Sequence, residues 1–540
     1  MPGIRSISIK MVSLMVLLAV SISIRAAHAA QKEGSIAGVV TDNSGQPAAG
    51  AFVKARNAER RFAVTVTSQE RGRYQIPNLP PGKYSVQGTG GGFQSDPGTS
   101  VELDGSLTAV QNLSLTIPQD FRKALSVSQS AALLPEGEGK TIVMNVCLGC
   151  HATGLYEILS ARKSRDAWAE TLEKMRNHPY GHDTSANFSD KQKSSLLDYL
   201  PKYFGPEAPP FDSKANVPKT WVRGAAAMSI VTEIDLPAGS HARDIVVDSK
   251  GTAWVGESGH GAIARIDPST LAYSRFPLPG GKSSPTSLEI DAQDRIWMGD
   301  APNKRLVQYD TKSGDFTVYP LPDPPHGGTG TNSIRIASDG AVWVTEQFAQ
   351  QILRLDPATK KVTAFPVPTA VLTKTDVDPY GIAIDPNQFV WFAERYSSKV
   401  GKVEPKTGEI AEFNVPTPGG QLKRMATDAE GNIWFTEYGG GGKLAMIDYR
   451  TGKFTEFPSP TKESGPYSVD VDRKRNRIWV NEIFSDQIAR YDPRTKTFVE
   501  YLIPTVNADV RRISLDPSRP DRVWFAERDL DKVGYLDVIE

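Results

Sequence analysis

The sequence predicts a multidomain, mainly β protein with an immunoglobulin- or transthyretin-like sandwich, a small α-helical domain and a seven-bladed β-propeller. Three observations predict this order. Short alternating strands separated by Gly and Pro turns come first, helical patterns then surround a Cys-x-x-Cys-His motif, and a Trp-x-x-acid motif finally recurs seven times. With 540 residues, 46 Gly and 39 Pro, the chain is long enough for several domains and rich in turns.

The first 30 residues have the parts of an export signal. Arg5 and Lys10 provide positive charge, residues 11–24 are apolar, and Ala27-His28-Ala29 fits a cleavage site. This apolar stretch of roughly 14 residues is shorter than the ~20 that a membrane-spanning helix needs. We therefore predict that residues 1–30 are a signal peptide, and that the mature protein has no membrane span and is periplasmic or secreted.

Residues 31–118 carry the sandwich pattern, with short strands broken at turns such as residues 42–47. The stretch resembles the carboxypeptidase regulatory-like domain, which implies an immunoglobulin-like fold used for stability or binding. Residues 119–134 are expected to be a linker. The resemblance rests on Gly38-x-Val40, Gly45-x-Pro47, Gly72-x-Tyr74 and Leu79-x-x-Gly82-x-Tyr84.

The only two cysteines of the chain lie in Cys147-Leu148-Gly149-Cys150-His151. Cys-x-x-Cys-His is the attachment signature of c-type haem: Cys147 and Cys150 form the thioethers, and His151 provides one axial ligand. A thioredoxin-like pair lacks its βαβ surroundings here, and a zinc site lacks two further ligands. We predict one covalent haem c.

Helical patterns over residues 136–146, 164–177 and 189–204 flank the motif, with Ser189 as an expected N-cap. Residues 135–204 resemble the haem domain of periplasmic cytochromes c, and residues 135–206 are expected to form such a domain. Met175 is the predicted sixth ligand, since thioether ligation is common in electron-transfer haems. Met175 would otherwise be a core residue, and His178 or His182 would then be the ligand.

After a Pro-rich linker over residues 207–228, residues 229–540 are expected to form the propeller. The tryptophans of the Trp-x-x-acid motif are spaced by 43 to 48 residues, and each unit reads as four strands. The array ends on a third strand at residues 533–537, whereas residues 231–237 match a fourth strand. The N-terminal segment should therefore complete the last blade and leave no strand edge exposed.

The array resembles the streptogramin (virginiamycin B) lyase family of seven-bladed propellers through Asp428–Glu437 and Arg265–Pro268. The resemblance implies ester elimination that uses a divalent cation with His and Glu near the channel mouth. In the family, the histidine stands just before the first strand of a blade. No blade of this sequence has a histidine at the matching position, and His241, His260 and His326 lie at other positions nearby. The matching residues are Arg243, Thr286, Asn332, Tyr380, Lys423, Tyr467 and Arg511.

Two sets of side chains are candidates for a propeller site. Glutamates that end the second strands, such as Glu346 and Glu437, either form an acidic ring or serve as structural partners inside the blades. Variable residues near the first strands would either line a pocket for an anionic or polyhydroxylated small molecule or neutralise one another in Arg–Glu pairs. They are Arg243, Tyr380, Arg424, Tyr467 and Arg511, with His241, Asp244, Arg335, Lys423 and Arg512 nearby.

Three functions follow. In the first, a periplasmic oxidoreductase, the propeller turns over a substrate and the haem passes electrons to a periplasmic redox partner. In the second, a non-catalytic propeller binds a small molecule or carbohydrate and the haem is an accessory. The third is a lyase. The equal numbers of basic and acidic residues, 62 each, argue against a nucleic-acid partner.

Overall fold

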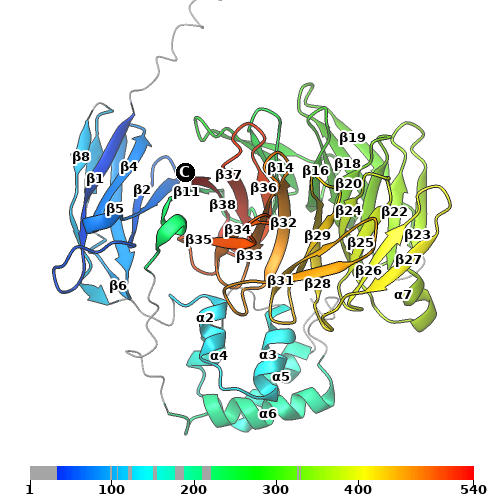
Figure 1. Ribbon diagram of the computed structural model, residues 1–540, viewed down its shortest axis with the longest axis horizontal. Helices are drawn as coiled ribbons and strands as arrows, with labels where there is room; N and C mark the ends of the chain where they lie inside the picture. The colour runs from blue at the N-terminus through cyan, green and yellow to red at the C-terminus, as the bar shows by residue number, and fades with distance from the viewer. Residues whose placement is uncertain are drawn as a thin grey trace, which may run out of the picture.

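The computed structural model describes residues 33–97, 100–105, 107–118, 124–149, 155–176, 188–209, 221–324, 328 and 330–539. They form a sandwich, a group of helices and a propeller (Figure 1). The predicted signal peptide and the candidates Cys150, His151, His178, His182 and His326 lie outside the described residues.

The sandwich consists of two sheets, one in the order β4-β1-β8 and the other containing β10-β6-β5-β2-β3. Alternation along the strands buries Ile36, Val53, Ile76 and Val86 between the sheets, as the sequence pattern requires. The strands are β1 (Gly34–Thr41), β2 (Phe52–Asn57), β3 (Phe62–Thr67), β4 (Arg73–Leu79), β5 (Gly82–Gly90), β6 (Phe93–Gln94), β7 (Ser100–Leu103), β8 (Thr108–Val110), β9 (Leu113–Ser114) and β10 (Ile117–Pro118).

Five helices follow in the described residues, and we call them the helical layer: α2 (Val127–Ala132), α3 (Glu138–Asn145), α4 (Tyr156–Ser160), α5 (Arg165–Arg176) and α6 (Asp190–Phe204). The predicted N-cap is confirmed, because the Ser189 hydroxyl accepts from the Gln192 amide and forms a capping box. Part of the predicted linker 119–134 is instead helical, since Ser126 caps α2 and Val127 is buried in the layer. No helix in the described part of the chain is both long and apolar enough to cross a membrane.

Seven four-stranded blades form the propeller, and their inner strands contact one another around a channel. Blades 1 to 3 are β12 (Ala242–Val247), β13 (Ala253–Glu257), β14 (Ala262–Ile266) and β15 (Tyr273–Pro277); β16 (Pro285–Ile290), β17 (Arg295–Asp300), β18 (Arg305–Asp310) and β19 (Phe316–Pro320); and β20 (Thr331–Ile336), β21 (Val342–Glu346), β22 (Gln351–Leu355) and β23 (Val362–Pro366).

Blades 4 to 6 repeat the pattern, with the short helix α7 (Pro368–Thr373) before blade 4. They are β24 (Pro379–Ile384), β25 (Val390–Glu394), β26 (Lys399–Val403) and β27 (Ile410–Asn414); β28 (Leu422–Thr427), β29 (Ile433–Glu437), β30 (Lys443–Ile447) and β31 (Phe454–Pro458); and β32 (Pro466–Asp472), β33 (Arg477–Glu482), β34 (Gln487–Asp492) and β35 (Thr497–Leu502).

Blade 7 is closed as the sequence predicts. It contains β36 (Val510–Leu515), β37 (Arg522–Glu527) and β38 (Lys532–Val538), and the N-terminal β11 (Ser229–Asp235) pairs with β38 as its fourth strand.

The other edge of β11 pairs antiparallel with β3, so one sheet runs from the sandwich into blade 7 (Figure 1). Ion pairs support this junction: Lys54 lies 2.8 Å from Glu233 and Arg56 lies 2.6 Å from Asp235. The expectation that no strand edge stays exposed is wrong for the other blades, because their fourth strands, such as β15, end four-stranded sheets in the described chain.

The recurring tryptophans are buried, and in blades 1, 2, 4 and 5 the indole is bonded to the aspartate six residues before it. The indole of Trp434 donates to Asp428 at 2.9 Å, and that carboxylate also accepts the amides of Glu430 and Asn432 in the preceding turn. Trp254 and Trp391 make the same bond to Asp248 and Asp385. In these blades one aspartate therefore fixes both the turn and the buried indole.

Candidate functional site

The channel has two mouths with different residues. Each inner strand starts at the same end of the propeller, which we call the helix-side mouth because the helical layer lies against it (Figure 1). The second residue of each inner strand belongs to this mouth, and the fifth residue belongs to the opposite end, the far mouth. The second residues are Arg243, Thr286, Asn332, Tyr380, Lys423, Tyr467 and Arg511.

Three buried tyrosines meet a lysine at the helix-side mouth. The hydroxyls of Tyr380 and Tyr467 are hydrogen-bonded to each other. The ammonium of Lys423 lies 4.6 Å from the ring centroid of Tyr380, 4.7 Å from that of Tyr438 and 5.2 Å from that of Tyr467. We call Tyr380, Tyr438, Tyr467 and Lys423 the tyrosine cluster. Three blades supply these residues, so the cluster exists only in the folded ring.

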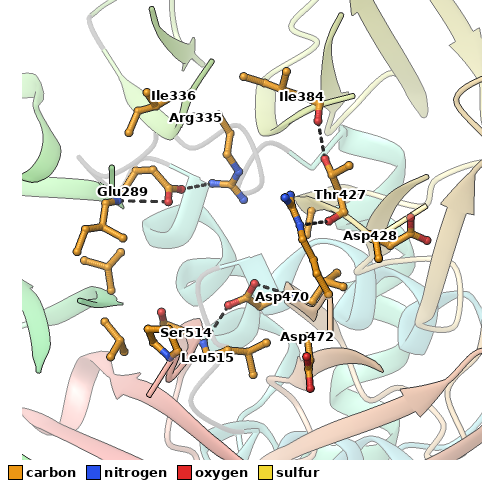
Figure 2. Close-up of a pocket in the computed structure, with 18 of the residues that line it drawn as sticks. Glu289, Arg335, Ile336, Ile384, Thr427, Asp428, Asp470, Asp472, Ser514 and Leu515 are labelled. Atoms are coloured by element: carbon orange, nitrogen blue, oxygen red, sulfur yellow. Dashed lines mark hydrogen bonds and ion pairs between the residues drawn. The ribbon is translucent and has the colours of Figure 1, made fainter. Parts of the chain in front are cut away.

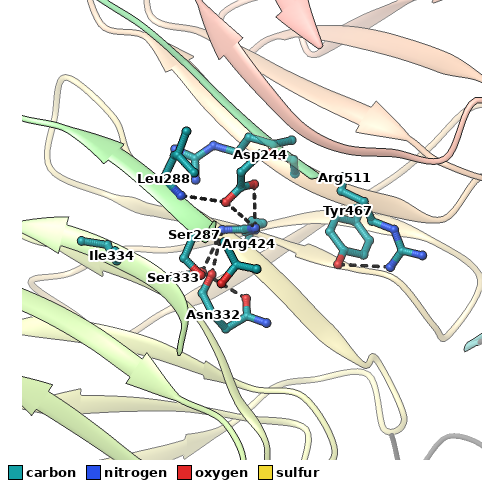
Figure 3. Close-up of polar contacts among 12 residues, drawn as sticks. Asp244, Ser287, Leu288, Asn332, Ser333, Ile334, Arg424, Tyr467 and Arg511 are labelled. Atoms are coloured by element: carbon teal, nitrogen blue, oxygen red, sulfur yellow. Dashed lines mark hydrogen bonds and ion pairs between the residues drawn. The ribbon is translucent and has the colours of Figure 1, made fainter. Parts of the chain in front are cut away.

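Arg511 borders this cluster and gives it positive charge. Its guanidinium donates to the Tyr467 hydroxyl at 3.5 Å and to the carboxylate of Asp509 at 2.7 Å (Figure 3). Burial favours the neutral phenol of Tyr467, but Arg511, Lys423 and Arg243 together outweigh burial and lower its pKa to about 7. Burial and the neighbouring Tyr467 raise the pKa of Tyr380 to about 12. The pair therefore consists of one phenol that ionises near neutrality and one that stays protonated.

The helical layer covers the tyrosine cluster. A turn at Cys147–Gly149 follows α3, and the Tyr438 hydroxyl donates to the carbonyl of Leu148 at 3.3 Å. The Gln421 amide donates to the carbonyl of Asn145 at 3.1 Å, and the Ser128 amide donates to the carbonyl of Phe484 at 2.7 Å. Leu148, Tyr380, Tyr438 and Tyr467 belong to one buried cluster. The first half of the cysteine motif therefore lies directly on the propeller.

Arg424 crosses the middle of the channel. Its guanidinium lies 3.0 Å from Asp244 of blade 1 and donates to the Ser333 hydroxyl and Asn332 carbonyl of blade 3 (Figure 3). Asp244 in turn accepts the Leu288 amide at 3.0 Å. Both charged side chains are almost fully buried. This bridge, which we call the septum, ties blade 5 to blades 1 and 3 and separates the tyrosine cluster from the far mouth.

The far mouth opens into a cavity of about 930 Å³. Glu289, Arg335, Asp470 and Ser514 line it, and the helices lie behind it in this view (Figure 2). Arg335 pairs with Glu289 and donates to the carbonyl of Met425 at 2.7 Å. The sequence placed Arg335 and Arg512 with the residues near the strand starts, but the structure puts them in the cavity at the opposite end.

Comparison with known families matches residues 223–372 and 369–539 to the virginiamycin B lyase family, which is more than half of the chain. The chain belongs to the virginiamycin B lyase family. Residues 35–116 match the carboxypeptidase regulatory-like domain. No curated protein sequence matches the chain.

Solved lyase structures share the propeller fold. Virginiamycin B lyase from Staphylococcus aureus is 24% identical with a TM-score of 0.51, covering 57% of this chain and 99% of that one. A streptogramin B lyase structure is 25% identical with a TM-score of 0.53, covering 58% of this chain and 99% of that one. A histidine-to-alanine variant of the S. aureus enzyme with quinupristin, described as catalytically inactive, is 23% identical with a TM-score of 0.51, covering 57% of this chain and 99% of that one.

This member of the virginiamycin B lyase family has no described histidine in its channel. His241 is exposed and its backbone amide donates to Asp531, while His260 lies 3.5 Å from Glu257 at the edge of blade 1. Within the described ranges, no three His, Cys, Asp or Glu side chains are grouped to hold a metal ion. The family histidine positions at the helix-side mouth instead hold tyrosines, cations, Thr286 and Asn332.

The glutamates at the ends of the second strands point into the blades. Glu346 accepts from Gln351 of β22, and Glu437 lies against Glu456 of β31. Burial, with repulsion from Glu456, raises the pKa of Glu437 to about 8, and burial also raises the pKa of Glu346. Their neighbours favour the structural interpretation over an acidic ring in the channel.

The described part of the cysteine motif is Cys147 and the turn that follows it. Cys147 and Met175 are both half-buried and pack on the apolar cluster that contains Leu148 and Trp168. Met175 lies near the end of α5, in the last turn of the helix. Its role as a haem ligand stays a prediction.

The sequence did not single out Tyr438, and it did not predict the residues that Arg424 contacts across the channel. Tyr438 directly follows the Trp-Phe-Thr-Glu motif of blade 5, whereas the equivalent position is Arg395 in blade 4 and Ile483 in blade 6. A comparison of the residue after each repeated acid would have singled out Tyr438. No local signal indicates that Arg424 bonds to a carboxylate 180 residues away.

Proposed function

We propose that this chain is an exported c-type cytochrome whose haem is held by the helical layer against the helix-side mouth of the propeller. One contact carries the proposal: the turn that begins with Cys147 packs on the propeller, where the carbonyl of the buried Leu148 accepts from Tyr438. The haem-attachment motif continues from this turn through Cys150 to His151. A haem attached there would join the helical layer and the propeller into one functional unit.

The residues of the helical layer fit such a group. Helices α3 and α6 cross so closely that a Cβ on Gly139 would lie 2.2 Å from the ring of Tyr199. The layer thereby forms a compact apolar cluster, on which Cys147 and Met175 pack. Cys147 and Cys150 would attach the haem through thioethers, while His151 and Met175 would bind its iron. The bound haem supplies one-electron transfer to and from a periplasmic redox partner.

The tyrosine cluster can exchange a proton at the helix-side mouth and can stabilise negative charge there. Because its pKa is about 7, Tyr467 can take up or release a proton at neutral pH, and Tyr380 holds its hydroxyl through a hydrogen bond. Lys423 and Arg511 stabilise the ionised phenol. The helical layer excludes water from this group. This combination supports an oxidoreductase component that couples electron transfer to proton movement at Tyr467.

A periplasmic or secreted location belongs to the same proposal. Covalent haem attachment by this motif and an export signal at residues 1–30 are consistent with each other. The sandwich would then serve as a rigid support, since its sheet continues into blade 7.

A second candidate is a lyase, which membership of the virginiamycin B lyase family favours. Tyr467 stands at a position where the family resemblance expects histidine, and its lowered pKa would allow it to act as a base. The contacts of the helical layer across this mouth oppose entry of a cyclic peptide.

Expression in a host with periplasmic haem-maturation machinery tests the proposal. The denatured protein should keep its haem and give a c-type pyridine spectrum, because the attachment is covalent. A variant with Cys147→Ala and Cys150→Ala is the matched control and should lose the haem on denaturation. A purified wild-type protein without a c-type band would end this proposal and leave the lyase candidate.

A further inference from the structure

The far mouth holds a buried arginine with almost no hydrogen bonds. Arg512 lines the cavity, is 8% exposed, and makes one hydrogen bond to the described residues, at 3.5 Å to Glu289. Asp244, Glu289 and Asp470 stabilise its charge, but a guanidinium has five N–H donors, so most donors of Arg512 remain for a ligand. We propose that the far mouth is a binding site for a small organic anion, with Arg512 as its anchoring residue.

The neighbouring arginines differ from Arg512 because their donors are used. Arg335 pairs with Glu289 and donates to the carbonyls of Ile334 and Met425 at 2.8 and 2.7 Å. Arg424 bonds to Asp244 and to blade 3 in the septum. Arg512 thus brings unused donors to a cavity whose other deep cations are already held.

The carboxylates around the cavity are also held by protein groups. Asp385 and Asp428 each accept an indole N–H and turn amides. Asp470 accepts the amides of Val471 and Leu515 at 2.8 and 3.0 Å, and Glu289 is paired with Arg335. Asp472 and Asp516 also line the cavity, and each accepts turn amides through one oxygen, while its second oxygen accepts no hydrogen bond from the described residues. The deep side chain with spare donors is therefore Arg512.

The rim adds two exposed cations. Arg473 and Lys474 follow the inner strand of blade 6, and both side chains line the cavity. They would attract an anion before it reaches Arg512. A guanidinium suits carboxylate or phosphate oxygens, because its N–H groups can bind two oxygens at once.

The size and lining of the cavity narrow the ligand further. About 930 Å³ is within the range of small-molecule sites, which are roughly 300–1,000 Å³. The described residues that line the cavity include no aromatic side chain, so nothing there offers the flat surface on which a sugar ring stacks. Small carboxylates and phosphates fit this lining.

The site does not depend on the haem. The septum of Arg424 and Asp244 lies between the cavity and the tyrosine cluster. Anion binding should therefore be the same in the haem-free full-length chain, and its failure would leave the haem proposal untouched.

Isothermal titration of the full chain with citrate, succinate and inorganic phosphate at low ionic strength tests the site. We expect at least one of the three to bind, and Arg512→Gln to weaken that binding by about tenfold or more. Arg494→Gln is the matched control, because Arg494 is exposed and pairs only with Asp492, and it should bind as the wild type does.

A second variant covers the case in which Arg512→Gln does not fold. Ser514→Glu keeps Arg512 but adds a carboxylate to the cavity lining, so it should also weaken anion binding by about tenfold. The proposal is overturned if none of the three anions binds the wild type at millimolar concentration. It is equally overturned if both variants bind as tightly as Arg494→Gln.

Discussion

Replacing Arg424 by Met should destabilise the propeller by about 3 kcal/mol. Arg424 and Asp244 are 4% and 0% exposed, 3.0 Å apart, and belong to opposite parts of the ring. Removing one partner of a buried ion pair costs about 3–5 kcal/mol, because the other charge stays buried without compensation. Asp244 still accepts the Leu288 amide, so we expect the lower end of this range, about a hundredfold in the unfolding equilibrium constant.

Urea unfolding followed by the fluorescence of the buried blade tryptophans measures this loss. The double variant Asp244→Asn, Arg424→Met should be less destabilised than the sum of its single variants, because it leaves no unpaired charge. Arg494→Met breaks an exposed ion pair with Asp492 and should cost less than about 1 kcal/mol. Equal losses for Arg424→Met and Arg494→Met, or additive single variants, would refute the septum as a buried ion pair.

Three further predictions concern the helix-side mouth. In the haem-loaded protein, Met175→Ala should remove the weak sulfur-to-iron band near the red end of the spectrum; persistence of the band would assign the ligand to another residue. Haem-free protein should show a phenolate absorbance step near pH 7 that Tyr467→Phe removes and the exposed Tyr156→Phe leaves in place. Because folding lowers the pKa of Tyr467 from 10 to about 7, its ionisation stabilises the folded state fully above about pH 10. This stabilisation decreases as the pH falls from 10 and is lost below about pH 7. Incubation with a streptogramin B and a divalent cation should give no ring-opened product at a useful rate, because no described histidine lies in the channel and the helical layer lies across the mouth that holds Tyr467. Fast turnover that stops on replacing His241 or His326 would show that an off-register histidine serves as the base.

The blades and their closure were predictable because the responsible signals are local. Each Trp-x-x-acid motif lies within one strand, and in four blades the aspartate that bonds the indole lies only six residues before the tryptophan. The missing fourth strand of the last blade was visible from the way the array begins and ends. The cap of α6 was predictable for the same reason, because Ser189 and Gln192 are neighbours in sequence.

The arrangement across the channel was not predictable from one sequence. Residues two and five of an inner strand are only three apart, but they belong to opposite mouths, which separates Tyr467 from Asp470. The partner of Arg424 is set by the closure of the ring rather than by its neighbours. The acids at the ends of the second strands repeat in every blade, and repetition alone does not distinguish a channel ring from blade interiors.

The double pairing of β11 has a consequence for the order of synthesis. Residues 236–531 separate β11 from β38, so most of the propeller must emerge from the ribosome before blade 7 can be completed. The strands of the sandwich end at residue 118, and its β3 edge can receive β11 as soon as that strand emerges. In the nascent chain, β11 can therefore already be paired with β3 when β38 is synthesised, so β38 pairs with a strand whose position is fixed.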